Sequence, residues 1–123
     1  DGDGAMADPP ESGTQQVSID VYESNLDKIV VRLQQTGAYL IWCSTTPVPE
    51  GSSGRIKGDA DRYNGVASRV AAKHNLAVND LYSFALERLG SIQRPANVHF
   101  TDDGSAVLGS QVVVAILGGL ERQ

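Results

Sequence analysis

Apolar residues along this chain recur with two spacings, one typical of helices and one typical of buried strands. Helical spacing, with apolar residues three or four positions apart, occurs in four segments: residues 20–37, 59–75, 81–90 and 104–120. Short and nearly continuous apolar runs, which are typical of buried strands, occur in two: residues 38–47 and 76–80. The predicted order is therefore helix, strand, helix, strand, helix, helix.

Residues at the ends of these segments support their bounds. Short polar side chains favour helix starts, and Gly or Asn favours helix ends. We expect Asp20 to begin the first helix, and Thr101 or Asp103 to begin the last. The predicted helix ends are Gly37, Asn75 and Gly90.

Alternation of strands with helices predicts an α/β fold with a parallel sheet between helical layers. The run at 38–47 ends at Pro47 and is apolar enough to be buried on both faces. Two strands are too few for a stable sheet. We therefore expect part of a doubly wound α/β domain over residues 18–123, with its N-terminal strands absent. Residues 14–19 could add one weak strand.

The last predicted helix, residues 104–120, has a wide apolar surface rich in Val. This composition predicts burial against the sheet. No run of about 18 consecutive apolar residues occurs, so we expect no membrane span.

The composition of the 123 residues fits one globular domain, with 41% hydrophobic and 20% charged residues. The net charge of −5 argues against nucleic acids and anionic membranes as partners, because both require clustered Lys and Arg. Residues 1–17 are acidic and rich in Gly and Pro, which predicts a flexible arm. Its "DGDG" start resembles a calcium loop, but Ala5 and Ala7 break the ligand pattern.

Cys43 is the single cysteine, which excludes an internal disulfide and a cysteine-based zinc site. Because it lies in an apolar run, we expect a small buried side chain. His74 and His99 give no metal-ligand spacing, and we predict no metal and no cofactor. His74 ends a helix, where the helix dipole favours it. No signal peptide is visible, and the sequence indicates no compartment.

Ligands of doubly wound folds bind at the carboxyl ends of the strands. Three segments reach that edge here: "STTPVPEGSS" after the first strand, "NDLYS" after the second, and the loop with His99. Thr45, Thr46 and Pro47 either contact a substrate or only shape the turn. His99 is either a functional group or a surface histidine.

Three blocks of the sequence together resemble the C-terminal half of SGNH hydrolases, the GDSL esterase/lipase family, over roughly residues 20–119. They are "LIWCSTTPVPEG", "YNGVASRVAAKHNLAVNDLYSFA" and "IQRPANVHFTDDGSAVLGSQVVVAI". The resemblance implies a serine hydrolase with a three-layer α/β/α (flavodoxin-like) fold. It also implies that His99 matches the histidine that takes the proton of the serine. It also implies oxyanion donors from a Gly block and an Asn block.

The chain departs from that pattern. It contains no Gly-Asp-Ser, no matching oxyanion blocks, and Ala96 where the family has the acid of the triad. Asn97 cannot act as a carboxylate, and a Ser–His dyad oriented by a backbone carbonyl would then be required. Asp102 and Asp103 follow His99, where the helix dipole favours acids. We expect the serines that could replace the nucleophile to be turn residues instead: Ser44, Ser52 and Ser53.

Two functions follow. In the first, the chain is the carboxyl half of an ester hydrolase for a small-molecule or carbohydrate ester, with Ser, Gly and Asn supplied by the missing N-terminal half. In the second, it is an inactive module that associates through an open sheet edge, most simply as a homodimer. The isolated chain is expected to lack activity in both.

Overall fold

The computed structural model describes residues 15–52 and 54–122. Its elements follow the predicted order, with one additional short helix: α1 (Ile19–Gln34), β1 (Ile41–Cys43), α2 (Asp59–Lys73), β2 (Ala77–Asn79), α3 (Leu81–Leu86), α4 (Leu89–Ile92) and α5 (Asp102–Leu120). Residues 1–14 of the predicted arm, with the "DGDG" stretch, and Ser53 lie outside the described residues.

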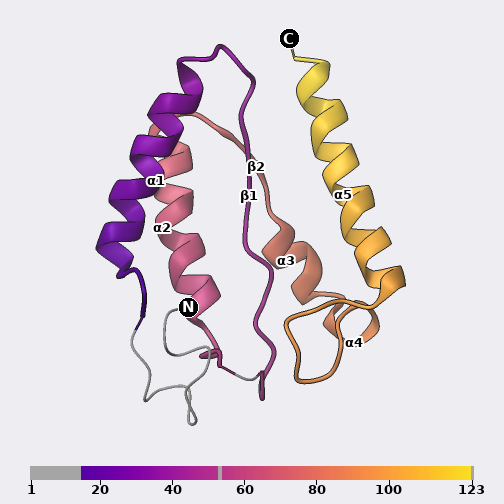
Figure 1. Ribbon diagram of the computed structural model, residues 1–123. Coiled ribbons are helices and arrows are strands. Elements are labelled where there is room, and N and C mark those ends of the chain that lie inside the picture. The colour runs from indigo at the N-terminus through magenta and orange to yellow at the C-terminus, as the bar shows by residue number, and fades with distance from the viewer. Residues whose placement is uncertain (1–14, 53, 123) are drawn as a thin grey trace.

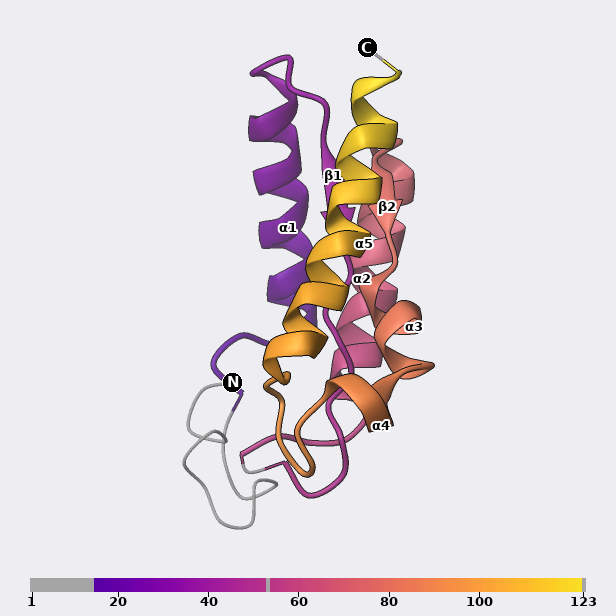
Figure 2. The same ribbon diagram turned by 90° about the vertical axis from the view of Figure 1, so that its right-hand side faces the viewer.

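The two strands form a parallel sheet between two helical layers, which confirms the predicted α/β fold class. β1 pairs with β2 in the register Ile41–Ala77, Trp42–Val78 and Cys43–Asn79. Figures 1 and 2 show α1 and α2 on one side of the strands and α5 on the other. Because the strands are parallel, their carboxyl ends lie at the same edge, where α2, α3 and α5 begin.

The core is concentrated around α2, whose apolar stripe meets α1 and the sheet. The buried apolar residues of that stripe lie three or four positions apart, as the helical spacing of residues 59–75 indicated: Val66, Ala67, Val70 and Ala71. Tyr63, which shares the stripe, is half-buried and packs edge-to-face on Tyr22 of α1, with ring centroids 5.0 Å apart. The α1–α2 pair therefore seals one face of the short sheet.

Two helix ends differ from the prediction. α1 is capped by Ser18 rather than Asp20, since the Ser18 Oγ accepts a hydrogen bond from the Val21 amide. Gly90 does not end the third helix, because α3 stops at Leu86 and Gly90 lies inside α4. At the end of α3, the Arg88 Nη1 donates to the Phe84 carbonyl at 2.8 Å and so satisfies a carbonyl that the helix end leaves without a partner.

Other predicted ends are confirmed. Asn75, with φ of 53°, is left-handed directly after His74, the C-cap of α2. Gly37, with φ of 75°, is also left-handed, but it lies two residues beyond Gln35, the C-cap of α1. Thr101 caps α5, and its Oγ1 accepts a hydrogen bond from the Gly104 amide at 3.0 Å.

The prediction that the first strand is buried on both faces was wrong. Cys43 is exposed and free, while Ile41 and Trp42 are half-buried. Within the described part of the chain β1 pairs with β2 alone, so its outer edge is open. The predicted extra strand is also wrong over the residues that can be judged, because residues 15–18 run without strand structure into α1.

Helix α5 is buried less than its apolar composition predicts. Only Gly104 and Gly119 are buried, and five apolar side chains near its C-terminus are exposed: Val113, Val114, Ile116, Leu117 and Leu120. By length and composition alone α5 could cross a membrane, so the expectation of no membrane span stays a prediction. Gly, Ser and Gln interrupt its apolar run, so a search for uninterrupted apolar residues misses it.

Candidate functional site

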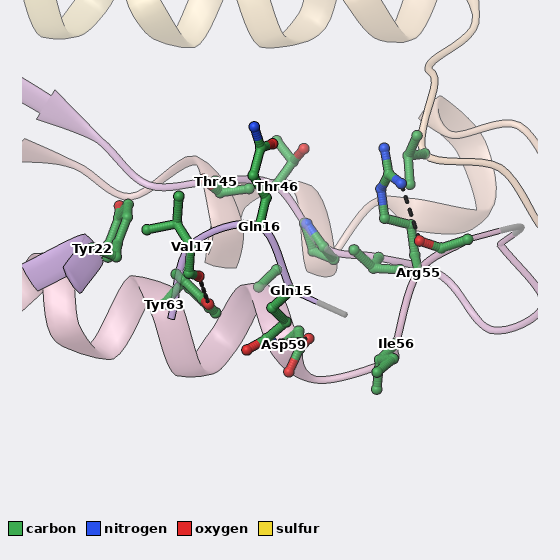
Figure 3. Close-up of a pocket in the computed structure, with 15 residues that line it drawn as sticks. Gln15, Gln16, Val17, Tyr22, Thr45, Thr46, Arg55, Ile56, Asp59 and Tyr63 are labelled. Atoms are coloured by element: carbon green, nitrogen blue, oxygen red, sulfur yellow. Dashed lines mark hydrogen bonds between the residues drawn. The ribbon is translucent and has the colours of Figure 1, made fainter. Parts of the chain in front are cut away.

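A pocket of about 420 Å³ opens at the carboxyl end of β1. Figure 3 shows it between the exit of β1, the residues that precede α1, and the start of α2. The loop that carries His99 adds Val98 to its wall. The residues that line it are Gln15, Gln16, Val17, Tyr22, Thr45, Thr46, Pro47, Val48, Gly54, Arg55, Ile56, Asp59, Ala60, Tyr63 and Val98.

The buried amide of Asn64 holds the exit of β1 in place. Its Nδ2 donates to the Thr45 carbonyl at 2.7 Å, and its Oδ1 accepts from the Thr45 amide at 2.8 Å. Asn64 lies on the buried side of α2 and is 8% exposed. A buried amide that is paired at both ends has a fixed orientation. The backbone at the pocket wall is therefore tied to the second helix.

A second buried amide, Gln93, joins the β1 exit to the histidine loop. Its Nε2 donates to the carbonyls of Pro47, at 3.2 Å, and Val98, at 3.4 Å. The backbone of Gln93 also forms an antiparallel bridge with Phe100. The Oε1 of Gln93 is buried and has no hydrogen-bond partner among the described residues. One side chain therefore brings together two loops that are far apart in the sequence.

His99 lies on this loop and is exposed. Its amide donates to the Asn97 Oδ1 at 2.9 Å, and its carbonyl accepts from the Arg94 amide at 3.0 Å. Ala96 adopts a left-handed conformation, with φ of 49°. Among residues 15–52 and 54–122, no side chain forms a hydrogen bond with the His99 ring. The loop is fixed through its backbone, and the imidazole faces solvent.

The loop closes tightly against the start of α5. The amide and the hydroxyl of Thr101 both donate to the Ile92 carbonyl, at 2.9 and 3.1 Å. Gly104 packs on the same carbonyl, and a Cβ at this position would lie 2.8 Å from the carbonyl carbon of Ile92. Only glycine fits there without moving the backbone. Asp102 and Asp103 lie exposed in the first turn of α5, where the helix dipole favours acids.

None of the described serines is arranged as a nucleophile for His99. Ser44 is buried, donates to the Asp80 Oδ1 at 2.8 Å, and accepts from the Tyr82 amide at 2.8 Å. It therefore ties β1 to the start of α3. The Ser83 hydroxyl, followed by other hydrogen bonds that include the one from Ser44, lowers the pKa of Asp80. Ser52 is buried, and its hydroxyl has no partner among the described residues.

The three residues expected either to contact a substrate or only to shape the turn all line the pocket. Thr45 is exposed, Thr46 is half-buried and Pro47 is buried. The histidine is connected to them through Val98 and Gln93. Sequence reasoning missed the two amide clamps, which are the buried side chains of Asn64 and Gln93 with their hydrogen bonds to loop backbone. A polar residue within the apolar stripe of α2 was a signal that could have identified Asn64, whereas Gln93 carried none.

His74 lies away from this site, at the end of α2. Its Nε2 is 2.7 Å from the Asp27 Oδ1 on α1, and the Lys73 Nζ lies 2.8 Å from the same oxygen. Lys73 first, and then His74, lower the pKa of Asp27 by hydrogen bonding. No group of three or more His, Cys, Asp or Glu side chains suited to a metal occurs among the described residues.

No protein-family model matches this chain, and the comparison with curated proteins gives no significant match. Among solved structures, the fold is similar to the lipase/acylhydrolase from Enterococcus faecalis, with a TM-score of 0.73 and 23% sequence identity. The match covers 85% of this chain and 54% of that one, so this chain spans about half the length of the structure it matches. The resemblance to SGNH hydrolases inferred from the sequence is confirmed at the level of the fold.

Proposed function

We propose that this chain is the carboxyl-terminal half of an SGNH-type serine ester hydrolase, in which His99 is the general base. The observation that carries the proposal is the position of the histidine loop, which lies beside a pocket at the carboxyl end of a parallel strand. Doubly wound folds bind their ligands at this edge. The substrate is a small-molecule or carbohydrate ester.

The exposure of His99 supports this role. Both backbone groups of His99 are held by the loop, whereas the ring reaches solvent at the edge of the sheet. An imidazole in this position can accept the proton of a serine hydroxyl supplied by a second polypeptide segment. That segment would also supply the oxyanion donors, since the sequence holds no Gly-Asp-Ser and no matching Gly and Asn blocks.

No carboxylate of the described residues touches the His99 ring, so we propose a Ser–His dyad. Asn97 cannot take the role of the acid, because its Oδ1 accepts the hydrogen bond of the His99 amide. In a dyad, a backbone carbonyl from the completed enzyme would orient the ring.

The open edge of β1 favours a second candidate, an inactive module that associates with another chain. An unpaired apolar edge is a template for strand addition. Cys43 of β1 is exposed, and Ile41 and Trp42 are only half-buried. A homodimer through β1, or an N-terminal half docked on it, would cover this edge. A stable monomer in light scattering would count against the homodimer.

The experiment compares p-nitrophenyl acetate hydrolysis by the chain alone and by the chain completed with an N-terminal half that carries Gly-Asp-Ser. The chain alone should show no turnover that depends on His99. In the completed enzyme, His99→Ala should lower kcat/KM by about a thousandfold or more.

His74→Ala is the matched control, since His74 pairs with Asp27 away from the pocket. It should leave kcat/KM within about twofold of the parent. Equal activity of the two alanine variants in a completed enzyme would overturn the role of His99. Turnover by the isolated chain that is lost in His99→Ala would overturn the claim that the nucleophile lies elsewhere.

A further inference from the structure

We propose that the outer side of α5 binds the same side of a second copy of this chain, with the two helices antiparallel. The contact joins two identical surfaces related by a two-fold axis, the commonest symmetry of protein dimers. It goes beyond the proposed function and does not depend on it, because it uses neither His99 nor the open edge of β1.

The outer side of α5 is exposed along the helix. Gly104 and Gly119 mark the inner side, since both are buried. Residues on the opposite side are exposed, including Leu117 at 55%. In Figures 1 and 2, no described element covers α5 on this side. A strand added to β1 would extend the sheet along the inner side of the helix, so it would leave this surface uncovered.

Exposed residues of the outer side recur at alternating steps of three and four, the spacing at which two helices pack along a shared seam. We call these residues the outer stripe: Asp103, Ala106, Ser110, Val113, Leu117 and Leu120. Contiguous exposed apolar surface often marks an interaction site. Between Gly104 and Leu120 the helix has no charged residue, so no like charges oppose contact with an identical surface there.

The outer stripe is divided by side-chain size, which selects an antiparallel partner. Its first half has small side chains at Ala106 and Ser110, and its second half has larger ones at Val113, Leu117 and Leu120. An antiparallel pair can place Ala106 opposite Leu117 of the second copy, and Ser110 opposite Val113. Each large side chain then meets a small one, and the two helices can pack closely. A parallel pair would instead place Leu117 against Leu117 and leave a gap between the two Ala106 residues.

The hydroxyl in the middle of the outer stripe has a partner within its own helix. The Ser110 Oγ donates to the Ala106 carbonyl at 3.0 Å. A buried polar group is costly only where it lacks a hydrogen bond. A second copy packed over Ser110 would therefore leave no hydroxyl donor without a partner.

The charges at the ends of α5 also favour the antiparallel arrangement. Asp102 and Asp103 lie in its first turn, and Glu121 and Arg122 follow its last turn. In a parallel pair, the acidic first turns of the two copies would lie side by side and repel one another. In an antiparallel pair, each acidic first turn lies beside an end whose two side-chain charges cancel.

A lipid surface fits the outer stripe less well than a second copy does. Helices that lie in a membrane interface are rich in Lys and Arg on their polar side, whereas α5 has no basic residue between Asp102 and Leu120. Asp103 and Ser110 make the first half of the stripe polar, and the chain has a net charge of −5. A second copy accounts for the whole stripe, and a bilayer accounts only for its last two turns.

The test measures the apparent mass of the full chain by sedimentation equilibrium over a wide range of concentration. The interface is one helix wide, so it belongs to the small and weakly associating class, below about 1,200 Å². The mass should rise from one copy toward two, with a dissociation constant on the order of 100 µM.

Leu117→Lys is the informative variant, because it places a charge in the seam. It should raise the dissociation constant by about tenfold or more. Leu86→Lys is the matched control, since Leu86 lies on α3, is 50% exposed, and receives the same change of side chain and charge. It should leave the dissociation constant within about twofold of the parent.

A pair of opposite charges tests the antiparallel register. Ala106→Glu alone should also raise the dissociation constant by about tenfold. In the double variant Ala106→Glu/Leu117→Lys, each new carboxylate faces the new ammonium group of the other copy. Within one chain the two sites are about three helical turns apart and do not meet. The double variant should therefore associate more tightly than either single variant, and weaker or equal association would overturn the proposal.

A chain that stays monomeric at all concentrations would also overturn it. Association that Leu117→Lys leaves unchanged would do the same, because the contact would then lie elsewhere, such as at the open edge of β1. Binding of the monomer to phosphatidylcholine vesicles that is lost in Leu117→Lys would assign the surface to lipid instead. None of these results bears on the role of His99, which is measured by hydrolysis in the completed enzyme.

Discussion

Two helices cover the same short sheet in different ways. α2 buries Val66, Ala67, Val70 and Ala71, and presents charged residues on its other side. α5, on the opposite face, buries only two glycines, and five of its large apolar side chains near the C-terminus remain exposed. The helix with fewer apolar residues is therefore the better buried of the two.

The difference comes from how each helix is attached. α2 is joined to α1 by polar contacts as well as by its core, with Arg69–Glu23 at 3.3 Å and Lys73–Asp27 at 2.8 Å. α5 is attached through the close approach of Gly119 to Tyr39 and through a hydrogen bond from Gln111 to Asn79. In an amphipathic helix such as α2, the charged side faces solvent and the apolar side faces the core. α5 has apolar residues on all sides, so its sequence does not fix which side faces the sheet.

The largest expected effect comes from placing a charge in each helix. Val70→Asp would bury an unpaired carboxylate at a site that is 3% exposed, and it should cost about 4 kcal/mol or more. Val113→Asp, at a site that is 53% exposed, should cost about 0.5 kcal/mol or less. Urea unfolding of the two variants measures the difference. An equal loss of unfolding free energy in the two variants would show that Val113 is as well buried in solution as Val70. It would contradict the difference in burial between α2 and α5.

A smaller effect is expected from two adjacent glycines of α5. A Cβ on Gly119 would lie 2.9 Å from the Tyr39 ring, while a Cβ on Gly118 would meet nothing within 4 Å. Gly118→Ala should stabilise the chain by about 0.5 kcal/mol through helix propensity. Gly119→Ala should instead destabilise it by about 0.5 to 1 kcal/mol, because the ring must move. Thermal unfolding of both variants tests the contact, and equal shifts would contradict it.

The smallest effect concerns the polar side of the α1–α2 pair. Asp27 has a pKa below its ordinary value of 3.8, mainly because Lys73 and then His74 hydrogen-bond to it. A lowered pKa in the folded state stabilises the protein above the unfolded pKa, and this contribution is lost as the pH falls through the folded value. The difference in unfolding free energy between the parent and Asp27→Asn should therefore be present at pH 5 and shrink toward pH 2.5. A difference that did not change with pH would contradict this assignment.

Periodicity alone was sufficient to predict the order of the main elements. The stripe of α2 and the left-handed residues Gly37 and Asn75 follow from local rules, which depend on a few neighbouring residues. The break between α3 and α4 does not follow from such rules, because the two residues between these helices, Glu87 and Arg88, are common helix residues. The exposure of Cys43 could not be predicted from neighbouring residues either. It depends on which elements pack around β1 in the folded molecule.

The place of Thr45, Thr46 and Pro47 after a strand put them at this edge of the sheet, where they line the pocket, and Val98 brings the histidine loop beside them. That they contact a substrate, and that His99 is functional, stay predictions. The clamps were not predicted, because a buried amide shows its importance only through partners that are distant in the sequence. Gln93 binds Pro47 across 46 positions of the chain.

That clamp has a consequence for the order in which the molecule is built. A single amide nitrogen serves carbonyls from the loop after β1 and from the loop before α5. A polypeptide leaves the ribosome with its amino end first, so Pro47 is synthesised well before Gln93. The hydrogen bond between the Pro47 carbonyl and the Gln93 amide can form only after Gln93 has been synthesised. The loop that carries His99 is synthesised after Gln93 and completes the same set of hydrogen bonds through Val98. The wall of the pocket therefore depends on residues from the last third of the chain.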